Sequence, residues 1–294
     1  MSPTALERLA LYFGAMRSRQ GLLARAELGV ADADDPALAL RLAQALAAEL
    51  RPDGSVGGAS VPTIWRVHEL LDLGRDAGDP ALGRAVAWVL QRQNGPGAYG
   101  EGCDKTRHAQ RICEHYVRGF FSPAPAAERV APIMLPNGKA FRAEPAARFA
   151  VSCLALRAVL RTGLRDRPAI ALHLDSLRSL AEGWTDWNGL FAPDVIIAGL
   201  HALALGGPAC RSVVERLVGL AAAHQNDEGH WEGADLFQTL DALVATGLPA
   251  ARGIVRRAIP ALEERQRADG GFGATAQQER ALIGLRAIRW ARAV

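Results

Sequence analysis

The stretches QNDEGHWEG (residues 225–233) and QRADGGFGA (residues 266–274) share a Gln, a turn containing Gly, and one bulky aromatic side chain at the same place. Fainter copies of this turn phrase surround Val56, Tyr99, Phe141 and Trp187, and the two clear copies carry Trp231 and Phe272. The six side chains follow one another at steps of 41 to 46 residues. This regularity predicts a repeat protein.

Each repeat is expected to form a helix, the turn phrase and a second helix. Asp35-Pro36 and Asp79-Pro80 begin two of the first helices, because Asp caps a helix N-terminus and Pro suits its first position. The second helices are more apolar, and Ala, Leu and Arg dominate throughout. We therefore predict an all-α chain of one domain, residues 1–294. Residues 35–292 would hold six repeats, and residues 1–30 would form an extra helix.

Six helical hairpins of equal length can stack as an open superhelix or close into a ring. We predict the ring, an α6/α6 toroid, because the six repeats use nearly the whole chain. The amphipathic helices would lie outside, and the more apolar helices would form an inner wall around a central cavity.

Composition narrows the class of protein. The 34 basic and 31 acidic side chains nearly balance, so no overall field attracts nucleic acid. The N-terminus lacks the apolar core of a secretory signal, and no run of about 18 apolar residues predicts a membrane span. The 4 cysteines make no disulfide framework, which is typical of the cytoplasm. We predict a cytoplasmic protein whose membrane contact, where it has any, is peripheral.

The turn phrase, written QxxxGxW or QxxDGGFG before an Ala- and Leu-rich helix, resembles the repeat of the squalene cyclase and protein prenyltransferase β-subunit superfamily. The resemblance covers residues 35–292 and is strongest in the last two copies. It implies an α6/α6 toroid with a hydrophobic cavity that suits isoprenoid chains. The same ring serves as a binding domain in other proteins, so the fold leaves the reaction open.

The resemblance also implies where an acid would lie. Class II terpene cyclases of this superfamily protonate an alkene or epoxide with the middle Asp of a DxDD motif that begins an inner helix. Here DADD at residues 32–35 aligns internally with a second Asp-Pro that only begins an outer helix. The sequence PDVII matches the family's motif at Asp194 alone, because Ile196 and Ile197 replace the acid and its neighbour. A correctly placed DxDD motif is therefore missing.

The stretch CDKTRHAQRICEHYVRGFF, residues 103–121, is the most polar of the predicted inner helices. Its ionisable side chains recur at steps of 4, 3, 4 and 3, which places them on one helix face. Facing the cavity, His108 would act as a general acid or base oriented by Asp104, with His115 on the same face. At the rim of the ring, the same stripe would be solvated or paired. Both placements stay open.

The predicted site combines this stripe with cations and aromatic rings. Cationic side chains can hold a diphosphate or carboxylate, and ring faces can stabilise a carbocation. The predicted catalytic residues are His108, Asp104, His115 and Asp194. The predicted substrate-binding residues are Lys105, Arg107, Arg111, Arg118, Trp65, Tyr116, Phe149 and Phe237.

Other polar residues of the inner helices are further candidates. Paired acids can bind magnesium or donate protons, whereas a lone polar residue more often completes a structural hydrogen bond. These candidates are Asp194 with His201, Asp235 with Gln238 and Asp241, and the single residues His68, Arg148 and Glu279. No metal site is predicted, because one helix cannot bring Cys103, His108, Cys113 and His115 to one zinc ion.

The function predicted from the resemblance and the stripe is a terpene cyclase-like enzyme, an isomerase or lyase of isoprenoid biosynthesis. It would cyclise or rearrange a small hydrophobic isoprenoid, a prenyl diphosphate or polyene, with Mg²⁺ needed only beside a diphosphate. The alternative is a noncatalytic toroid that binds a lipid or peptide. A sugar-active enzyme would instead need two carboxylates across a polar cleft. Product and oligomeric state stay open.

Overall fold

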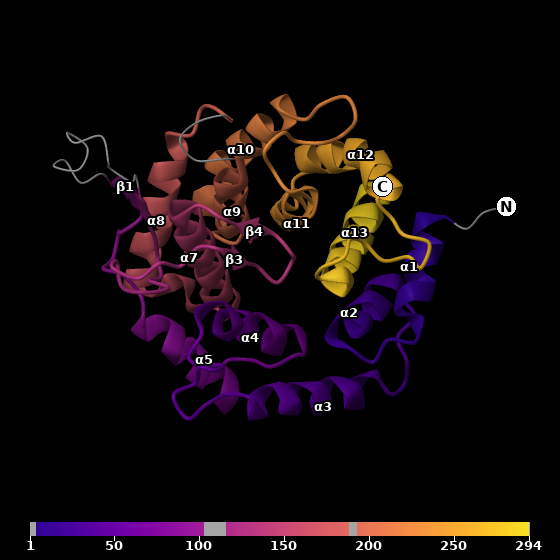
Figure 1. The fold of residues 1–294 in the computed structure, drawn as a ribbon, viewed down its shortest axis with the longest axis horizontal. Coiled ribbons are helices and arrows are strands. Elements are labelled where there is room, and N and C mark those ends of the chain that lie inside the picture. Colours follow the sequence, from indigo (N-terminus) through magenta and orange to yellow (C-terminus); the bar gives the residue numbers. More distant parts are fainter. Residues whose placement is uncertain (1–3, 103–115, 188–192, 294) are drawn as a thin grey trace.

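The computed structural model describes residues 4–102, 116–187 and 193–293. This part of the chain is mostly helical, which confirms the all-α prediction. Figure 1 shows the helices in two layers around a ring. The outer layer holds α1 (Ala5–Gly14), α3 (Asp35–Ala48), α5 (Pro80–Gln91), α8 (Pro168–Glu182), α10 (Arg211–Ala223) and α12 (Pro249–Glu264). The inner layer holds α2 (Arg19–Leu28), α4 (Ser60–Asp72), α7 (Glu144–Arg161), α9 (Pro193–Ala204), α11 (Leu236–Thr246) and α13 (Gln277–Arg292).

The inner helices are more deeply buried than the outer ones. Every residue of α9 from Pro193 to Leu203 is buried, whereas α3 buries only Leu38 and Ala43. Consecutive inner helices contact one another, and α13 also contacts α2. The first and last inner helices are thus neighbours, and the ring closes (Figure 1). No helix in the described ranges is both long and apolar enough to cross a membrane.

The N-terminal segment differs from its prediction. Residues 5–28 form the two helices α1 and α2, where one extra helix outside the repeats was expected. Thr4 caps α1 through a capping box with Glu7, and Ser18 caps α2. Because α1 joins the outer layer and α2 the inner layer, this segment supplies a full helix pair.

The turn phrases join each repeat to the next outer helix. Gln225 Nε2 donates a hydrogen bond to Ile254 O in α12 (3.1 Å), and Gln266 Nε2 donates to Ala5 O in α1 (3.1 Å). Gly270, at φ +87°, lies so close to the α1 backbone that a Cβ atom would overlap it. The last phrase therefore contacts α1 in the same way that the phrase before it contacts α12.

Two of the six predicted phrases belong to one repeat. In the last phrase Gln266 forms an antiparallel bridge with the phrase aromatic Phe272, but Gln93 bridges Phe121 instead of the expected Tyr99. The inner helix after Phe121 is α7, which also follows the phrase around Phe141. The even spacing of Tyr99 and Phe141 is therefore no sign of two repeats. The helix pair α1–α2 restores the number of inner helices to six within the described residues.

The inner helix predicted over residues 103–121 is wrong in its last part. Residues 103–115 lie outside the described residues, and Tyr116–Arg118 is a strand. Position 119 needs a glycine, since a Cβ atom there would overlap the Ser152 side chain in α7. Phe121 N then donates to Ser152 Oγ (3.0 Å). The short strands are β1 (Gly100–Gly102) paired with β2 (Tyr116–Arg118), and β3 (Ile133–Met134) paired with β4 (Ala140–Phe141), both pairs antiparallel.

The two predicted Asp-Pro helix starts have different chemistry. Asp79 caps α5, and its side chain accepts hydrogen bonds from Ala81 N and Leu82 N. Asp35 begins α3 but pairs with Arg25 of α2 (2.5 Å). The DADD stretch therefore begins an outer helix, and its last carboxylate is already engaged.

We expect Gly54→Ala to destabilise the protein by about 2 kcal/mol more than Gly57→Ala, the cost of overpacking a fixed backbone. Both glycines have positive φ in the same turn, so both variants carry the same class of backbone strain. Only at Gly54 would the new Cβ atom overlap another residue, the Arg84 backbone oxygen of α5. Urea unfolding measures the two free energies, and equal losses would contradict the proposed contact.

Candidate functional site

A cavity of about 520 Å³ lies at the C-terminal ends of the inner helices. Asp72, Arg161, Leu205, Ala245 and Ala293 line it at or next to the ends of α4, α7, α9, α11 and α13. The lining combines aliphatic and indole surface with four carboxyl groups, four guanidinium groups and two imidazoles. The wall of this cavity is therefore mixed, with charged groups beside the apolar surface that was predicted.

Arg19 of α2 links the first and last inner helices beside the cavity. Its guanidinium forms ion pairs with Asp72 of α4 and Glu279 of α13, and only 6% of the side chain is exposed. Gln20 Nε2 donates to the same Glu279 carboxylate (3.1 Å). The Arg19 guanidinium also lies over the Trp65 ring, 5.2 Å from its centroid. These contacts bind α2, α4 and α13 together at the closure of the ring.

His68 of α4 is held in one tautomer. Its Nε2 lies 3.2 Å from Leu154 O, a pure acceptor, so the proton belongs on Nε2. Nδ1 then accepts a hydrogen bond from Arg161 Nη1 (3.0 Å). Burial, together with Arg157 and Arg161, lowers the pKa of His68 well below its usual value. The imidazole is therefore a neutral acceptor that orients Arg161.

Asp241 of α11 lies between a histidine and an arginine from two other inner helices. Its Oδ2 is 3.6 Å from His201 Nδ1 and 3.8 Å from Arg157 Nη2, both beyond hydrogen-bonding distance. Burial raises the pKa of Asp241, and the Arg157 charge acts against that rise. Burial lowers the pKa of His201 well below its usual value, and Arg157 lowers it further. A neutral imidazole thus faces a carboxyl group that burial drives toward its protonated form.

The opposite end of the ring is covered by the β3–β4 hairpin, residues 133–141. Figure 1 shows this hairpin reaching toward the centre of the ring. Arg280 in the first turn of α13 donates from Nε to Asn137 O (3.0 Å) and from Nη2 to Gly138 O (3.1 Å). Lys139 forms an ion pair with Asp194 at the start of α9. The hairpin is thus tied to two inner helices.

Asp194, one of the predicted catalytic residues, is buried and occupied by these contacts. One oxygen pairs with Lys139, and the other accepts a hydrogen bond from Asp235 N (3.0 Å). Burial raises the pKa of Asp194, and Lys139 acts against that rise. Asp194 lies outside the lining of the cavity and acts here as an anchor for the hairpin.

The other predicted catalytic residues, His108, Asp104 and His115, lie outside the described residues, as do Lys105, Arg107 and Arg111. Tyr116 and Arg118 lie in β2, and the structure describes only their backbone. The roles assigned to these residues stay predictions.

The predicted aromatic residues divide between the cavity and the core. Trp65 lines the cavity. Phe149 is fully buried, packs against Tyr99 (centroids 5.9 Å apart) and Trp184 (6.0 Å), and lies outside the lining of this cavity. Phe237 packs against the phrase aromatic Phe272 (5.4 Å) and lines a separate pocket of about 420 Å³ together with Arg280.

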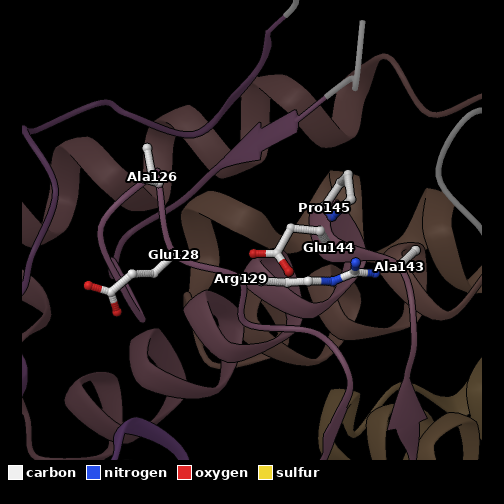
Figure 2. Close-up of a pocket in the computed structure, with 7 residues that line it drawn as sticks. Ala126, Glu128, Arg129, Ala143, Glu144 and Pro145 are labelled. Atoms are coloured by element: carbon white, nitrogen blue, oxygen red, sulfur yellow. The ribbon is translucent and has the colours of Figure 1, made fainter. Parts of the chain in front are cut away.

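A second hollow, of about 470 Å³, lies between residues 126–129 and the start of α7. Figure 2 shows Glu144 there beside Arg129, with Glu128 turned away from both. Glu144 accepts hydrogen bonds from Val130 N (2.9 Å) and Ala131 N (2.7 Å) and pairs with Arg148 (2.7 Å). Although burial raises the pKa of Glu144, these partners lower it below its usual value. Glu144 and Arg148, a further predicted candidate, therefore hold the loop in place.

Sequence reasoning found part of the cavity wall. The candidates included His68 and Glu279 as lone polar residues, His201 as the partner of Asp194, and Asp241 in the group with Asp235 and Gln238. Of these, His68, His201, Asp241 and Glu279 line the cavity. Sequence reasoning missed the cations that surround them, which are Arg19, Arg157, Arg161, Arg286 and Arg289. The available signal was the pair Arg157 and Arg161, one turn apart in the otherwise apolar stretch AVSCLALRAVLR.

Comparison with known proteins supports the fold. No protein-family model matches the chain, and no curated protein matches its sequence. A variant of the type II terpene cyclase MstE from Scytonema, in complex with geranylgeranyl dihydroxybenzoate as substrate, is similar in structure, with a TM-score of 0.54 and 15% identity over 96% of this chain and 86% of that chain. A second variant, in complex with the product merosterolic acid A, gives the same four values.

A protein from Actinoplanes is also similar, with a TM-score of 0.56 and 16% identity over 92% of this chain and 89% of that chain. At such identities the likeness shows a shared fold, which is that of terpene cyclases. It does not extend to the reaction.

We expect Arg19→Met to destabilise the protein by about 3–5 kcal/mol, because it leaves the buried Glu279 carboxylate without its cation, whereas Asp72 keeps its pair with Arg161. The exposed pair of Arg211 and Glu215 is the control, and Arg211→Met should cost less than about 1 kcal/mol. Burial already raises the pKa of Glu279, and Arg19 opposes that rise. Without Arg19, the folded-state pKa of Glu279 moves further above its unfolded value, so stability is lost as pH rises through it.

The loss caused by Arg19→Met should therefore be smaller at pH 5 than at pH 8. Chemical unfolding of both variants and the parent protein at the two pH values measures this difference. A loss independent of pH would mean that Glu279 does not depend on Arg19.

We expect Lys139→Met to loosen the β3–β4 hairpin, at a cost of about 1–3 kcal/mol for leaving the buried Asp194 group unpaired. Amide hydrogen exchange across residues 133–141 should accelerate while exchange in α9 changes little. Arg142→Met removes an exposed cation next to the same hairpin and serves as the control. Equal exchange rates in the two variants would show that the ion pair does not hold the hairpin.

Proposed function

We propose that this chain is a terpene cyclase-like enzyme that cyclises or rearranges an isoprenoid in the cavity at the C-terminal ends of the inner helices. The observation that carries the proposal is the Asp241 carboxyl, which lines a cavity that also presents Trp65 and Trp290 and lies 3.6 Å from His201 and 3.8 Å from Arg157. Burial raises the pKa of this carboxyl. The shared fold supports the proposal, because the type II terpene cyclase MstE has this fold and binds geranylgeranyl dihydroxybenzoate as substrate and merosterolic acid A as product.

The chemistry follows from these groups. A protonated Asp241 transfers its proton to a carbon–carbon double bond, a C–H bond forms, and a carbocation and a carboxylate remain. Arg157 and His201 lie on either side of the carboxylate, so its new charge is formed beside a cation and an imidazole. The indole faces of Trp65 and Trp290 can stabilise the cation until a proton leaves it or water adds.

The lining offers room for an apolar chain beside the charged groups. Leu205, Val244, Ala245 and Ala293 supply aliphatic surface in the same cavity. A chain bound against them would place its double bond near Asp241, on the neighbouring turn of α11 from Val244. Magnesium enters this proposal only as a companion of a diphosphate substrate.

The predicted His108 and Asp104 pair remains a second source of the proton. The alternative function, a noncatalytic ring that binds a lipid or peptide, is favoured by one observation. Asp72 and Glu279 are already paired with Arg19, so those two carboxyl groups serve the structure. Turnover decides between these possibilities.

We expect the purified protein to convert at least one member of a panel of C10 to C20 prenyl diphosphates and squalene into a new hydrocarbon or alcohol. Asp241→Asn should lower the rate by about 100-fold or more, because the amide cannot donate the proton. Asp175→Asn, on the exposed face of α8, should leave the rate unchanged. Gas chromatography with mass spectrometry detects the products, with and without Mg²⁺.

The pH dependence has a definite sign. Because the proton donor must be protonated, the rate should fall as pH rises through the raised pKa of Asp241. His108→Ala is measured in parallel. Loss of product in His108→Ala alone would assign the proton to the 103–115 segment, and no turnover across the panel would favour the binding ring.

A further inference from the structure

We propose that the cavity at the C-terminal ends of the inner helices is an oxyanion-binding site, in which Arg157 and Arg161 of α7 and His201 of α9 hold a carboxylate or phosphate group. The site goes beyond the proposed reaction, because it specifies the head group that a ligand must carry. It also stands without turnover, since binding is measured directly.

Arg157 is the first observation. The side chain is 19% exposed and lines the cavity, and its nearest carboxylate oxygen lies 3.8 Å away. Its Nε atom is buried without a hydrogen-bond partner, and the described residues show no hydrogen bond from its other nitrogens. A guanidinium group has five N–H donors, and burying it without partners is costly. An oxyanion in the cavity would supply the missing acceptors.

Arg161 is the second observation. It follows Arg157 by one helical turn, so both guanidinium groups face the same cavity, and like charges at this spacing repel. Arg161 has fixed geometry, because Nη1 donates to His68 Nδ1 (3.0 Å) and Nη2 donates to Asp72 Oδ1 (2.6 Å). The Arg161 charge therefore cannot move away from the Arg157 charge. An anion between the two groups would convert their repulsion into attraction.

His201 is the third observation. It is buried and lines the cavity, yet the described residues offer it no hydrogen bond, since Asp241 Oδ2 lies 3.6 Å from Nδ1. A neutral imidazole carries one N–H donor and one acceptor. The donor is therefore free for a ligand oxygen in the same cavity as Arg157.

The ion pairs of the cavity wall leave Arg157 available to an anion. Asp72 and Glu279 share Arg19, Arg161 adds to Asp72, and Glu27 pairs with Arg286 (3.2 Å). The lining holds four guanidinium and four carboxyl groups, and the buried Arg19 adds a fifth guanidinium from behind the wall. Among the described residues, Arg157 has no carboxylate within hydrogen-bonding distance, so its charge is available to an anion. The planar fork of arginine matches the two oxygens of a carboxylate or phosphate. A cavity of about 520 Å³ leaves space for an apolar remainder against Trp65 and Trp290.

The test is isothermal titration calorimetry on the full chain, with inorganic pyrophosphate and with benzoate as separate probes and without Mg²⁺. We expect one equivalent of at least one probe to bind, and the probe that binds more tightly identifies the head group as phosphate or carboxylate. Arg157→Met should weaken binding at least tenfold. Arg41→Met, which removes the same charge from an exposed position on α3, should change it less than twofold.

Arg157→Lys is the control that separates loss of binding from a folding defect. It keeps the positive charge but loses the fork, and we expect affinity between that of the parent and that of Arg157→Met, with a parent-like unfolding temperature. Absence of binding by both probes to the parent protein would overturn the site. Equal affinities of Arg157→Met and Arg41→Met would do the same. Because the assay measures no product, its result is independent of whether the panel of isoprenoids is turned over.

Discussion

The structure depends on the contact between each turn phrase and the outer helix that follows it, and above all on the last such contact, which closes the ring. Gln266 and Gly270 meet α1 as the preceding phrase meets α12. The side-chain amide of the Gln needs a backbone carbonyl as its hydrogen-bond acceptor. The glycine, which has no Cβ atom, lets the backbone of the next helix come close. Within the described residues, the N-terminal helix α1 supplies the backbone that the last phrase contacts.

Closure has an electrostatic consequence at the inner layer. Once α2 lies between α13 and α4, Arg19 must be buried, and it meets carboxylates from both neighbours. A buried ion pair adds little net stability compared with apolar packing, but its loss is costly and its geometry is specific. Arg19 therefore serves to define which helices meet. It also gives the cavity a polar wall, because the same carboxylates hold Arg161 in place.

The helical repeat could be predicted from the sequence because its signals are local. Glycines at turn positions, Asp-Pro helix starts and apolar helices each follow from backbone and burial rules. The error at residues 103–121 has a physical origin, because helical spacing of charged residues says nothing about a glycine pressed against Ser152 of a distant helix. The N-terminal pair was misjudged for a related reason. Its role depends on a contact with Gln266 at the far end of the chain.

The candidate site was also hard to predict, because its residues are far apart in the sequence. His68, Asp241 and Glu279 were visible as polar residues on inner helices, but a lone polar residue in a sequence has no partner to interpret it. The ring brings the last turns of its inner helices together, so groups far apart in the chain share one desolvated space and shift one another's pKa values. Some of these groups form ion pairs with one another. Arg157 and His201 are left without hydrogen bonds within the described residues, and a chain that buries such donors at one open cavity is organised to receive an acceptor from outside.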